Sequence, residues 1–76
     1  MAYNKREEKE LKELDSIKPG YRTRIIETEK GRLLDVREYA EAPNFTGFTR
    51  KGIRLKKEEI QKAISVFTEA LEELSS

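Results

Sequence analysis

The 76-residue sequence contains neither cysteine nor histidine. Without cysteine, no disulfide and no thiolate metal site can reinforce the fold. Without histidine, the commonest general base and the commonest metal ligand are also missing. The four glycines are isolated from one another and form no phosphate-cradling motif. These absences exclude most classes of enzyme, and we predict a binding protein that uses no cofactor and no metal.

Long apolar runs are also missing, and only 36% of the residues are hydrophobic. Because charged residues begin almost at the amino terminus, we expect neither a signal peptide nor a membrane span. The sequence thus predicts a soluble protein with no membrane partner, cytoplasmic or nucleoid-associated, or nuclear in a eukaryote. A single domain this small buries little apolar surface, which favours association into a homodimer.

The net charge of +1 conceals a separation of charge along the chain. Residues 1–20 are neutral overall, residues 21–56 hold nine Lys/Arg and five Asp/Glu, and residues 57–76 hold two and five. The middle of the chain is therefore basic and its end acidic. Because electrostatic fields act over roughly 8 to 10 Å at physiological salt, a basic surface can attract polyanions even on a nearly neutral protein.

Residues 1–20 are predicted to be a charged helix followed by a break. Residues 4–15 are strong helix formers with opposite charges at helical spacing, as in Glu8 and Lys12. Lys18-Pro19-Gly20 then ends the helix, because proline lacks an amide donor and glycine tolerates left-handed backbone angles. We expect a solvated helix more than a partner-binding one.

Residues 21–76 are predicted to form the functional domain, which begins with a hairpin. Residues 21–28 alternate as a strand does, and the turn 29–31, with Gly31 available for a positive φ, leads into a second strand at 33–39. In that strand Leu34 and Val36 point to one face, whereas Asp35, Arg37 and Tyr39 point to the other. The sheet therefore has an apolar face and a basic, partly aromatic face.

A loop is predicted at residues 40–49, because Pro43, Asn44 and Gly47 interrupt the pattern there. The next strand follows at residues 50–55, where Ile53 and Leu55 share one face. Gly52 could mark a bulge that breaks this alternation.

The carboxy-terminal helix, residues 57–74, has the clearest periodicity in the sequence. Its apolar stripe should cover either the apolar face of the sheet or a partner helix. The stripe residues that we assign to the core or to a dimer are Ile60, Ile64, Phe67, Leu71 and Leu74.

Basic residues interleaved with aromatics on strands are typical of proteins that hold single-stranded nucleic acid, where cations follow the phosphates and bases stack on rings. The candidate residues are Arg22, Arg24, Lys30, Arg32, Arg37, Tyr39, Phe45, Phe48, Arg50, Lys51, Gly52 and Arg54. The competing interpretation is structural. Arg37 is equally a candidate salt-bridge partner of Asp35 or Glu38, and a loop phenylalanine commonly packs under a sheet edge.

Two stretches together carry a resemblance to a known family. Leu34 to Tyr39 reads aliphatic-Asp-aliphatic-Arg-Glu-Tyr, and a Pro-containing loop separates it from Arg50-Lys51-Gly52-Ile53-Arg54-Leu55 and a terminal amphipathic helix. This order resembles the carboxy-terminal single-stranded-DNA-binding domain of the transcriptional coactivator positive cofactor four family, in a compact prokaryotic, archaeal or phage-like version. The resemblance spans about residues 21–74.

The resemblance implies an α+β fold: a curved antiparallel sheet, one carboxy-terminal helix and a homodimer formed partly through the helices, here with the extra amino-terminal helix. It further implies sequence-nonspecific binding of single-stranded or melted DNA in transcription, replication or repair, with Arg37, Arg50, Lys51 and the Gly52 backbone near the DNA. RNA and transcription or replication proteins are further candidate partners. A protein-interaction module on the same dimeric fold is the alternative.

Many members of that family carry a stacking tryptophan where this chain has Ala40. Two alternatives follow for base recognition. Tyr39, Phe45 and Phe48 supply the stacking surfaces, or binding is more purely electrostatic.

Overall fold

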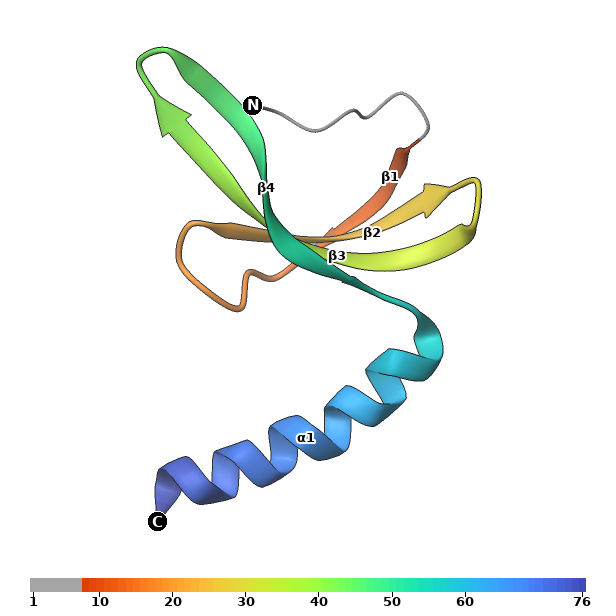
Figure 1. Ribbon diagram of the computed structural model, residues 1–76, viewed down its shortest axis with the longest axis vertical. Helices are drawn as coiled ribbons and strands as arrows, with labels where there is room; N and C mark the ends of the chain where they lie inside the picture. The colour runs from red at the N-terminus through yellow and green to blue at the C-terminus, as the bar shows by residue number, and fades with distance from the viewer. Residues whose placement is uncertain (1–7) are drawn as a thin grey trace.

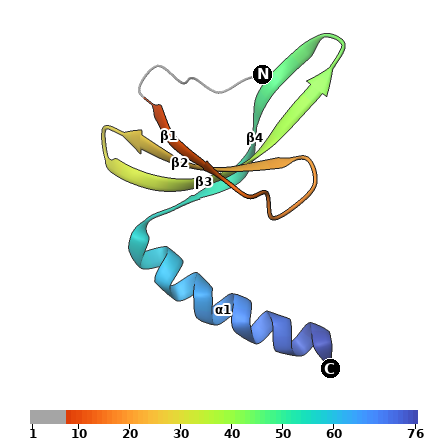
Figure 2. The same cartoon turned by 180° about the vertical axis from the view of Figure 1, so that it is seen from behind.

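The structure of the protein is a computed structural model that describes residues 8–76. These residues form a four-stranded antiparallel sheet followed by one helix (Figures 1 and 2). The strands lie in the order in which they occur in the chain, so each is joined to its neighbour by a turn. The elements are β1 (Lys9–Leu14), β2 (Tyr21–Thr28), β3 (Gly31–Ala42), β4 (Phe45–Leu55) and α1 (Lys57–Ser75). The expected sheet and carboxy-terminal helix are confirmed.

The predicted amino-terminal helix is wrong for the residues that the structure describes. Residues 9–14 form β1, which pairs antiparallel with β2, while residues 4–7 lie outside the described residues. A solvated helix would gain only weak ion pairs between its own side chains. As a strand, the same residues gain backbone hydrogen bonds to β2 and bring Glu10 and Glu13 beside arginines. Tertiary pairing thus overrides local helix propensity.

The hairpin of β2 and β3 forms as predicted. Its register pairs Thr28 with Gly31 and Ile25 with Leu34, and Gly31 has a φ of +110° in the turn. The Lys18-Pro19-Gly20 break also occurs, as part of the turn from β1 to β2: Gly20 has a φ of +83°, and the Tyr21 amide donates to the Lys18 carbonyl (3.1 Å). Local turn chemistry is sufficient to place both reversals.

The predicted loop over residues 40–49 is mostly strand. β3 continues to Ala42 and β4 begins at Phe45, so that only Pro43 and Asn44 form the turn. Gly47 lies within β4 with a φ of +151° and pairs with Ala40. The two long strands therefore form a hairpin arm that continues beyond β2 (Figure 1).

A bulge interrupts the pairing of β3 with β4, as the glycine at position 52 suggested. Arg37 pairs with Gly52 and Tyr39 with Phe48, so one β3 residue faces three residues of β4 between these pairs. A Cβ atom at Gly52, whose φ is +150°, would lie 2.2 Å from the Val36 carbonyl oxygen. Only glycine allows the two backbones to approach so closely here.

The sheet has two chemically different faces, as the alternation along the strands predicts. The charged face carries the guanidinium groups of β2, β3 and β4 around Asp35, and the apolar face carries Ile25, Leu34, Val36, Ile53 and Leu55. Within residues 8–76, the buried hydrophobic residues are Ile26, which lies on the charged face, and Phe48, which contacts Arg24 there. The best-buried part of the protein is therefore its charged side.

Helix α1 begins at Lys57, where the Glu59 carboxylate accepts a hydrogen bond from the Lys56 amide (2.7 Å) in place of a conventional cap. After its first turn the helix runs away from the sheet (Figure 1). Ile60 is half-buried near Leu34 and Leu55, but the rest of the stripe, Ile64, Phe67, Leu71 and Leu74, is exposed. The expectation that α1 covers the sheet of its own chain is wrong, and contact with a partner helix stays a prediction.

Candidate nucleic-acid interface

The centre of the charged face is Asp35, a fully buried carboxylate shared by three arginines. Its Oδ2 accepts a hydrogen bond from Nη2 of Arg24 (2.7 Å), and its Oδ1 accepts from Nε of both Arg37 and Arg54 (3.2 Å each). Arg24 and Arg37 are themselves only 4% and 8% exposed. A buried carboxylate with several charge-assisted hydrogen bonds is held in one geometry, so this cluster fixes how β2, β3 and β4 lie relative to one another.

Carboxylates from the β1 segment, which is Glu8 together with β1, add a second layer of ion pairs. Glu13 accepts two hydrogen bonds from Arg22, at 2.8 Å from Nε and 2.7 Å from Nη2, in the two-pronged geometry that arginine favours. Glu10 lies 3.4 Å from Nη1 of Arg24, and Glu8 pairs with Arg54. Three neighbouring arginines therefore each face a glutamate from a single segment of chain.

The pKa directions follow from these pairs. The hydrogen bond from Arg22 lowers the pKa of Glu13 below its ordinary value of 4.5, and the same bond raises the pKa of Arg22. At Arg54, burial alone would lower the pKa, but the hydrogen bonds to Glu8 and Asp35 outweigh burial and raise it. These groups are ionised at neutral pH and stabilise one another as charges.

The aromatic candidates pack against the arginines. Tyr39 and Phe48 make an edge-to-face pair with ring centroids 5.1 Å apart, and the Arg24 guanidinium carbon lies 4.0 Å from the Phe48 centroid. Arg22 lies 4.9 Å from the Tyr39 centroid. Phe48 is buried, whereas Tyr39 and Phe45 are half-buried. The Phe48 ring is thus part of the core, and the ring of Tyr39 contacts the guanidinium group of Arg22.

Four candidate cations remain exposed, and they lie at two places. Lys30 lies in the turn between β2 and β3, and Arg32 lies at the start of β3, where its Nε is 3.9 Å from the carboxylate of its register partner Glu27. Arg50 and Lys51 lie on the β4 bulge next to Gly52.

Thr49 ties the bulge to β3. Its hydroxyl donates to Glu38 (3.0 Å) and accepts from the Lys51 amide (3.1 Å), and its carbonyl accepts from Arg37 (3.3 Å). The bulge therefore presents its two cations from a backbone that is fixed to the neighbouring strand.

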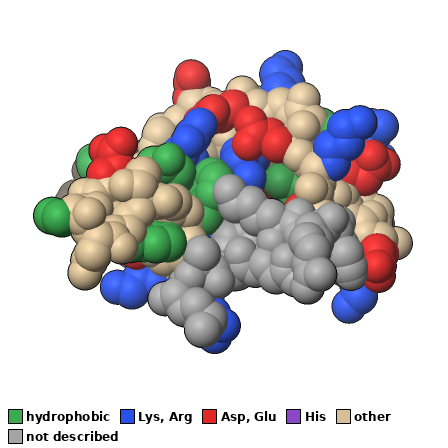
Figure 3. Space-filling model, turned by 90° about the horizontal axis from the view of Figure 1, so that it is seen from above, with side chains coloured by type: hydrophobic (Ala, Val, Ile, Leu, Met, Phe, Trp, Pro, Cys, Tyr) green, Lys and Arg blue, Asp and Glu red, His purple; other side chains and the backbone are tan. Residues whose placement is uncertain are grey.

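The structure separates the predicted site residues into two groups. One group is covered: Arg24, Arg37 and Phe48 are buried, and Arg22, Tyr39, Phe45 and Arg54 are half-buried. Within it, Arg24, Arg37 and Arg54 are held in ion pairs with Asp35, which is the structural interpretation that the sequence left open. The exposed group is Lys30, Arg32, Arg50, Lys51 and Gly52. Over the described part of the face seen in Figure 3, Lys/Arg and Asp/Glu side chains alternate and form no continuous basic surface.

The sequence interpretation missed Glu8, Glu10 and Glu13 as partners of the basic face. It assigned them to a solvated helix, in which no arginine of the sheet would meet them. The Glu-x-Glu spacing at residues 8–10 is a signal for the first two, because an extended chain puts both carboxylates on one side. Glu13 reaches the same side only through the register shift between Glu10 and Lys12.

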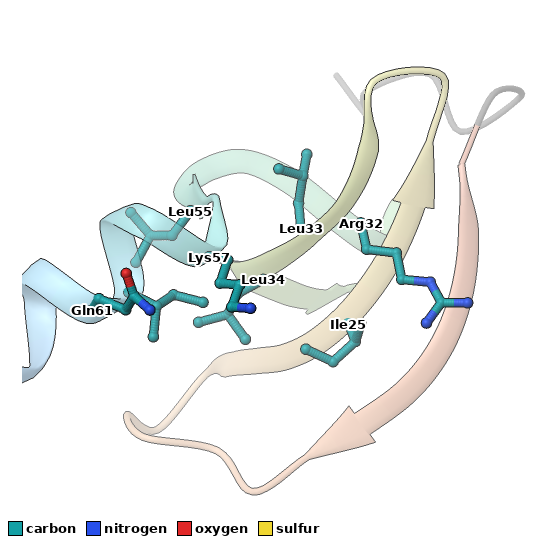
Figure 4. A pocket seen from close by; sticks show the side chains of 8 residues that line it. Ile25, Arg32, Leu33, Leu34, Leu55, Lys57 and Gln61 are labelled. Carbon is teal, nitrogen blue, oxygen red and sulfur yellow. The ribbon is translucent and has the colours of Figure 1, made fainter.

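The apolar face carries a shallow groove of about 230 Å³ where α1 leaves the sheet (Figure 4). Ile25 and Leu34 come from the sheet, and Lys57 and Gln61 come from the first turns of the helix. A second groove on the same face is lined by Ile17, Tyr21, Val36 and Ile53, the last of which is 55% exposed. Residues 8–76 therefore cover this face only in part.

No helix among residues 8–76 is long and apolar enough to span a membrane. The same residues contain no group of three or more acidic side chains placed to hold a metal ion. Comparison of the chain with protein-family models, with curated proteins and with solved structures finds no match.

Proposed function

We propose that the protein binds single-stranded or melted nucleic acid without sequence specificity, as a homodimer acting in transcription, replication or repair. The observation that carries the proposal is the pair of exposed cations, Arg50 and Lys51, on a fixed bulge of an antiparallel sheet. Exposed Lys and Arg side chains bind the phosphates of a nucleic acid, and the surface of a β-strand can accommodate an extended single strand. The order of sheet and helix agrees with the coactivator family that the sequence resembles.

Two details of the structure shape this proposal. Phe48 is buried and Arg22 lies over the ring of Tyr39. Less aromatic surface is therefore available for base stacking than the three rings proposed from the sequence would provide. The second alternative from the sequence, mainly electrostatic binding, therefore has more support. Arg50, Lys51, Lys30 and Arg32 are its proposed phosphate contacts, together with the exposed backbone of Gly52 beside the first two.

The homodimer in this proposal is supported by the exposed stripe of α1. Phe67 and Leu71 are 61% and 67% exposed, and they lie on one side of the helix, one turn apart. Large apolar side chains gathered on one helix face mark an interaction surface. A second copy of α1 offers the same stripe and would cover it in a two-fold arrangement.

Fluorescence anisotropy with labelled oligo-dT, oligo-U and a matched duplex, measured over a salt series, tests the proposal. We expect tighter binding to the single strands than to the duplex, and an affinity that falls as salt rises. The double variant Arg50→Ala/Lys51→Ala should lower the affinity and reduce the salt slope by about 1.4, the value for two lost single-strand phosphate contacts.

A matched control is the variant Lys57→Ala/Lys62→Ala, which removes the same charge from α1. Its salt slope should equal that of the unmodified protein. Binding that prefers the duplex, or that does not respond to salt, would contradict the proposal.

A protein-interaction module with the same dimeric fold is the second candidate. It is favoured by one observation, that glutamates of the β1 segment already occupy three arginines of the charged face. Recovery of a specific protein partner from nuclease-treated extract, together with no binding to any oligonucleotide, would favour this candidate over the first.

A further inference from the structure

The glutamates of the β1 segment occupy positions at which phosphates would bind. Glu13 meets Arg22, Glu10 meets Arg24 and Glu8 meets Arg54, all on the charged face of the sheet. A carboxylate and a phosphate both accept charge-assisted hydrogen bonds from the same guanidinium edge. An extended run of glutamates along a row of arginines therefore has the same chemistry as an extended phosphate backbone.

Strand β1 is also the strand with the least support from the rest of the fold. It lies at the edge of the sheet, it is hydrogen-bonded to β2 alone among the strands of residues 8–76, and every one of its six residues is exposed. Its register shifts between Glu10 and Lys12, and Leu11 and Leu14 remain 37% and 38% exposed. Elements with little buried apolar surface open at the lowest free-energy cost.

The charged face of the sheet, on which the three glutamates lie, is strongly basic. The charged face carries Arg24, Arg37 and Arg54 around the carboxylate of Asp35, and Arg22 over the ring of Tyr39. With the glutamates displaced, these arginines would present several positive charges to an incoming anion. The surface would then resemble the basic and aromatic channel that the sequence predicted.

We infer that β1, with Glu8, Glu10 and Glu13, is an acidic strap that occupies a polyanion-binding channel, and that single-stranded nucleic acid competes with it for the arginines. This inference rests on the proposed function and adds a mode of regulation to it. Phosphates bind first at the exposed Arg50 and Lys51 and then displace the glutamates. The strap lowers the affinity for any short or weakly charged anion that cannot displace all three.

Removal of the strap charges is the first test. The variant Glu8→Gln/Glu10→Gln/Glu13→Gln should bind oligo-dT about tenfold more tightly, because three ion pairs no longer compete with the phosphates. The matched control Glu69→Gln/Glu72→Gln/Glu73→Gln removes the same charge from α1 and should change the affinity less than threefold. Circular dichroism of both variants verifies that the fold is kept.

A reversible lock on the strap is the second test, and it leaves the three glutamates in place. Lys9 and Glu27 are register partners on β1 and β2, both are exposed, and their charges cancel. Facing residues of antiparallel strands lie within the Cα separation that a disulfide spans. Because the chain has no cysteine of its own, Lys9→Cys/Glu27→Cys forms one defined crosslink.

The oxidised lock should bind oligo-dT about tenfold more weakly than the unmodified protein, and reduction with dithiothreitol should restore the affinity. Hydrogen exchange provides an independent readout, since the β1 amides should exchange faster when oligo-dT is bound.

The outcomes separate this inference from the function on which it rests. Equal affinities for the unmodified protein, the glutamine variant and the oxidised lock would overturn the strap and leave nucleic-acid binding intact. Tighter binding by the glutamine variant together with weaker binding by the lock would support both. If no form of the protein binds oligo-dT, the proposed function fails, and the strap fails with it.

Discussion

On the sheet, the carboxylate of Asp35 is fully buried and Arg24 is 4% exposed, whereas on α1 Phe67 is 61% exposed and Leu71 is 67% exposed. The two regions thus reverse the usual places of charged and apolar side chains. On the sheet, the buried charges pair with one another through hydrogen bonds between Asp35 and three arginines. The helix has no such partner among the described residues of its own chain, so its stripe is the part of the molecule that points to association.

The buried charges of the sheet and the exposed stripe of α1 also differ in what they contribute to the fold. A buried ion pair contributes little net stability compared with an apolar pair, but loss of one member is costly because the other is left as an uncompensated charge. The arginines of three strands converge on one carboxylate, so the cluster specifies the arrangement of β2, β3 and β4. On α1, by contrast, we expect that a change of one exposed stripe residue, such as Phe67 or Leu71, leaves the fold of the chain intact.

The largest expected effect comes from Asp35→Ala. It leaves two almost fully buried arginines without their shared partner, and we expect a loss of about 3 to 5 kcal/mol in the free energy of unfolding. Urea denaturation measures this loss. The control Glu27→Ala removes an exposed carboxylate 3.9 Å from Arg32 and should cost less than about 1 kcal/mol. Equal losses for the two variants would mean that the sheet does not depend on its buried charge.

An intermediate effect is expected on α1, and on association alone. The variant Phe67→Ser/Leu71→Ser removes two large apolar side chains from the proposed dimer contact and should raise the dimer dissociation constant by about a hundredfold or more. Sedimentation velocity over a range of protein concentrations measures the constant.

The matched control for the helix is Glu69→Ser/Glu73→Ser, which places the same two serines on α1 outside the stripe. Its dissociation constant should remain close to that of the unmodified protein. If the unmodified protein is monomeric at every concentration, the proposed dimer is contradicted, and the exposed stripe would have to bind a different partner.

The smallest effect is expected at the exposed edge of the charged face, where Arg22 lowers the pKa of Glu13. A carboxylate with a lowered folded-state pKa stabilises the protein above its unfolded-state value, near 4.5, and this contribution is lost as the pH falls through the lowered folded value. Urea midpoints from pH 7 to about pH 3 should therefore show a small gap between the unmodified protein and Glu13→Gln that closes at low pH. A gap that widens under acid would contradict the assignment.

The elements that the sequence predicted correctly depend on local patterns. The strand at residues 21–28, the turn at Gly31 and the helix from Lys57 all agree with the structure. Alternation in 33–39 also separated the apolar from the charged side chains correctly. Such signals need only the neighbouring residues, because turn geometry and side-chain period are properties of a short stretch of backbone.

The errors occurred where distant residues decide the outcome. Residues 9–14 have a helical composition, yet an available edge of β2 made them a strand. Residues 40–49 have loop-forming residues, yet pairing across the Pro43-Asn44 turn extended both strands. In each case, inter-strand hydrogen bonds that a local pattern does not contain outweighed the local preference.

By itself the sequence determined the alternation that gives the sheet two faces, the reversals at Gly20 and Gly31, and the apolar stripe of the last helix. Only the tertiary structure decided which charges are paired, that Asp35 gathers three arginines, and that glutamates from the β1 segment lie over the charged face. The physical reason is the distance along the sequence over which each feature is determined. Alternation and turn geometry arise within a few residues, whereas an ion pair depends on which strands lie side by side, and those can come from distant parts of the chain.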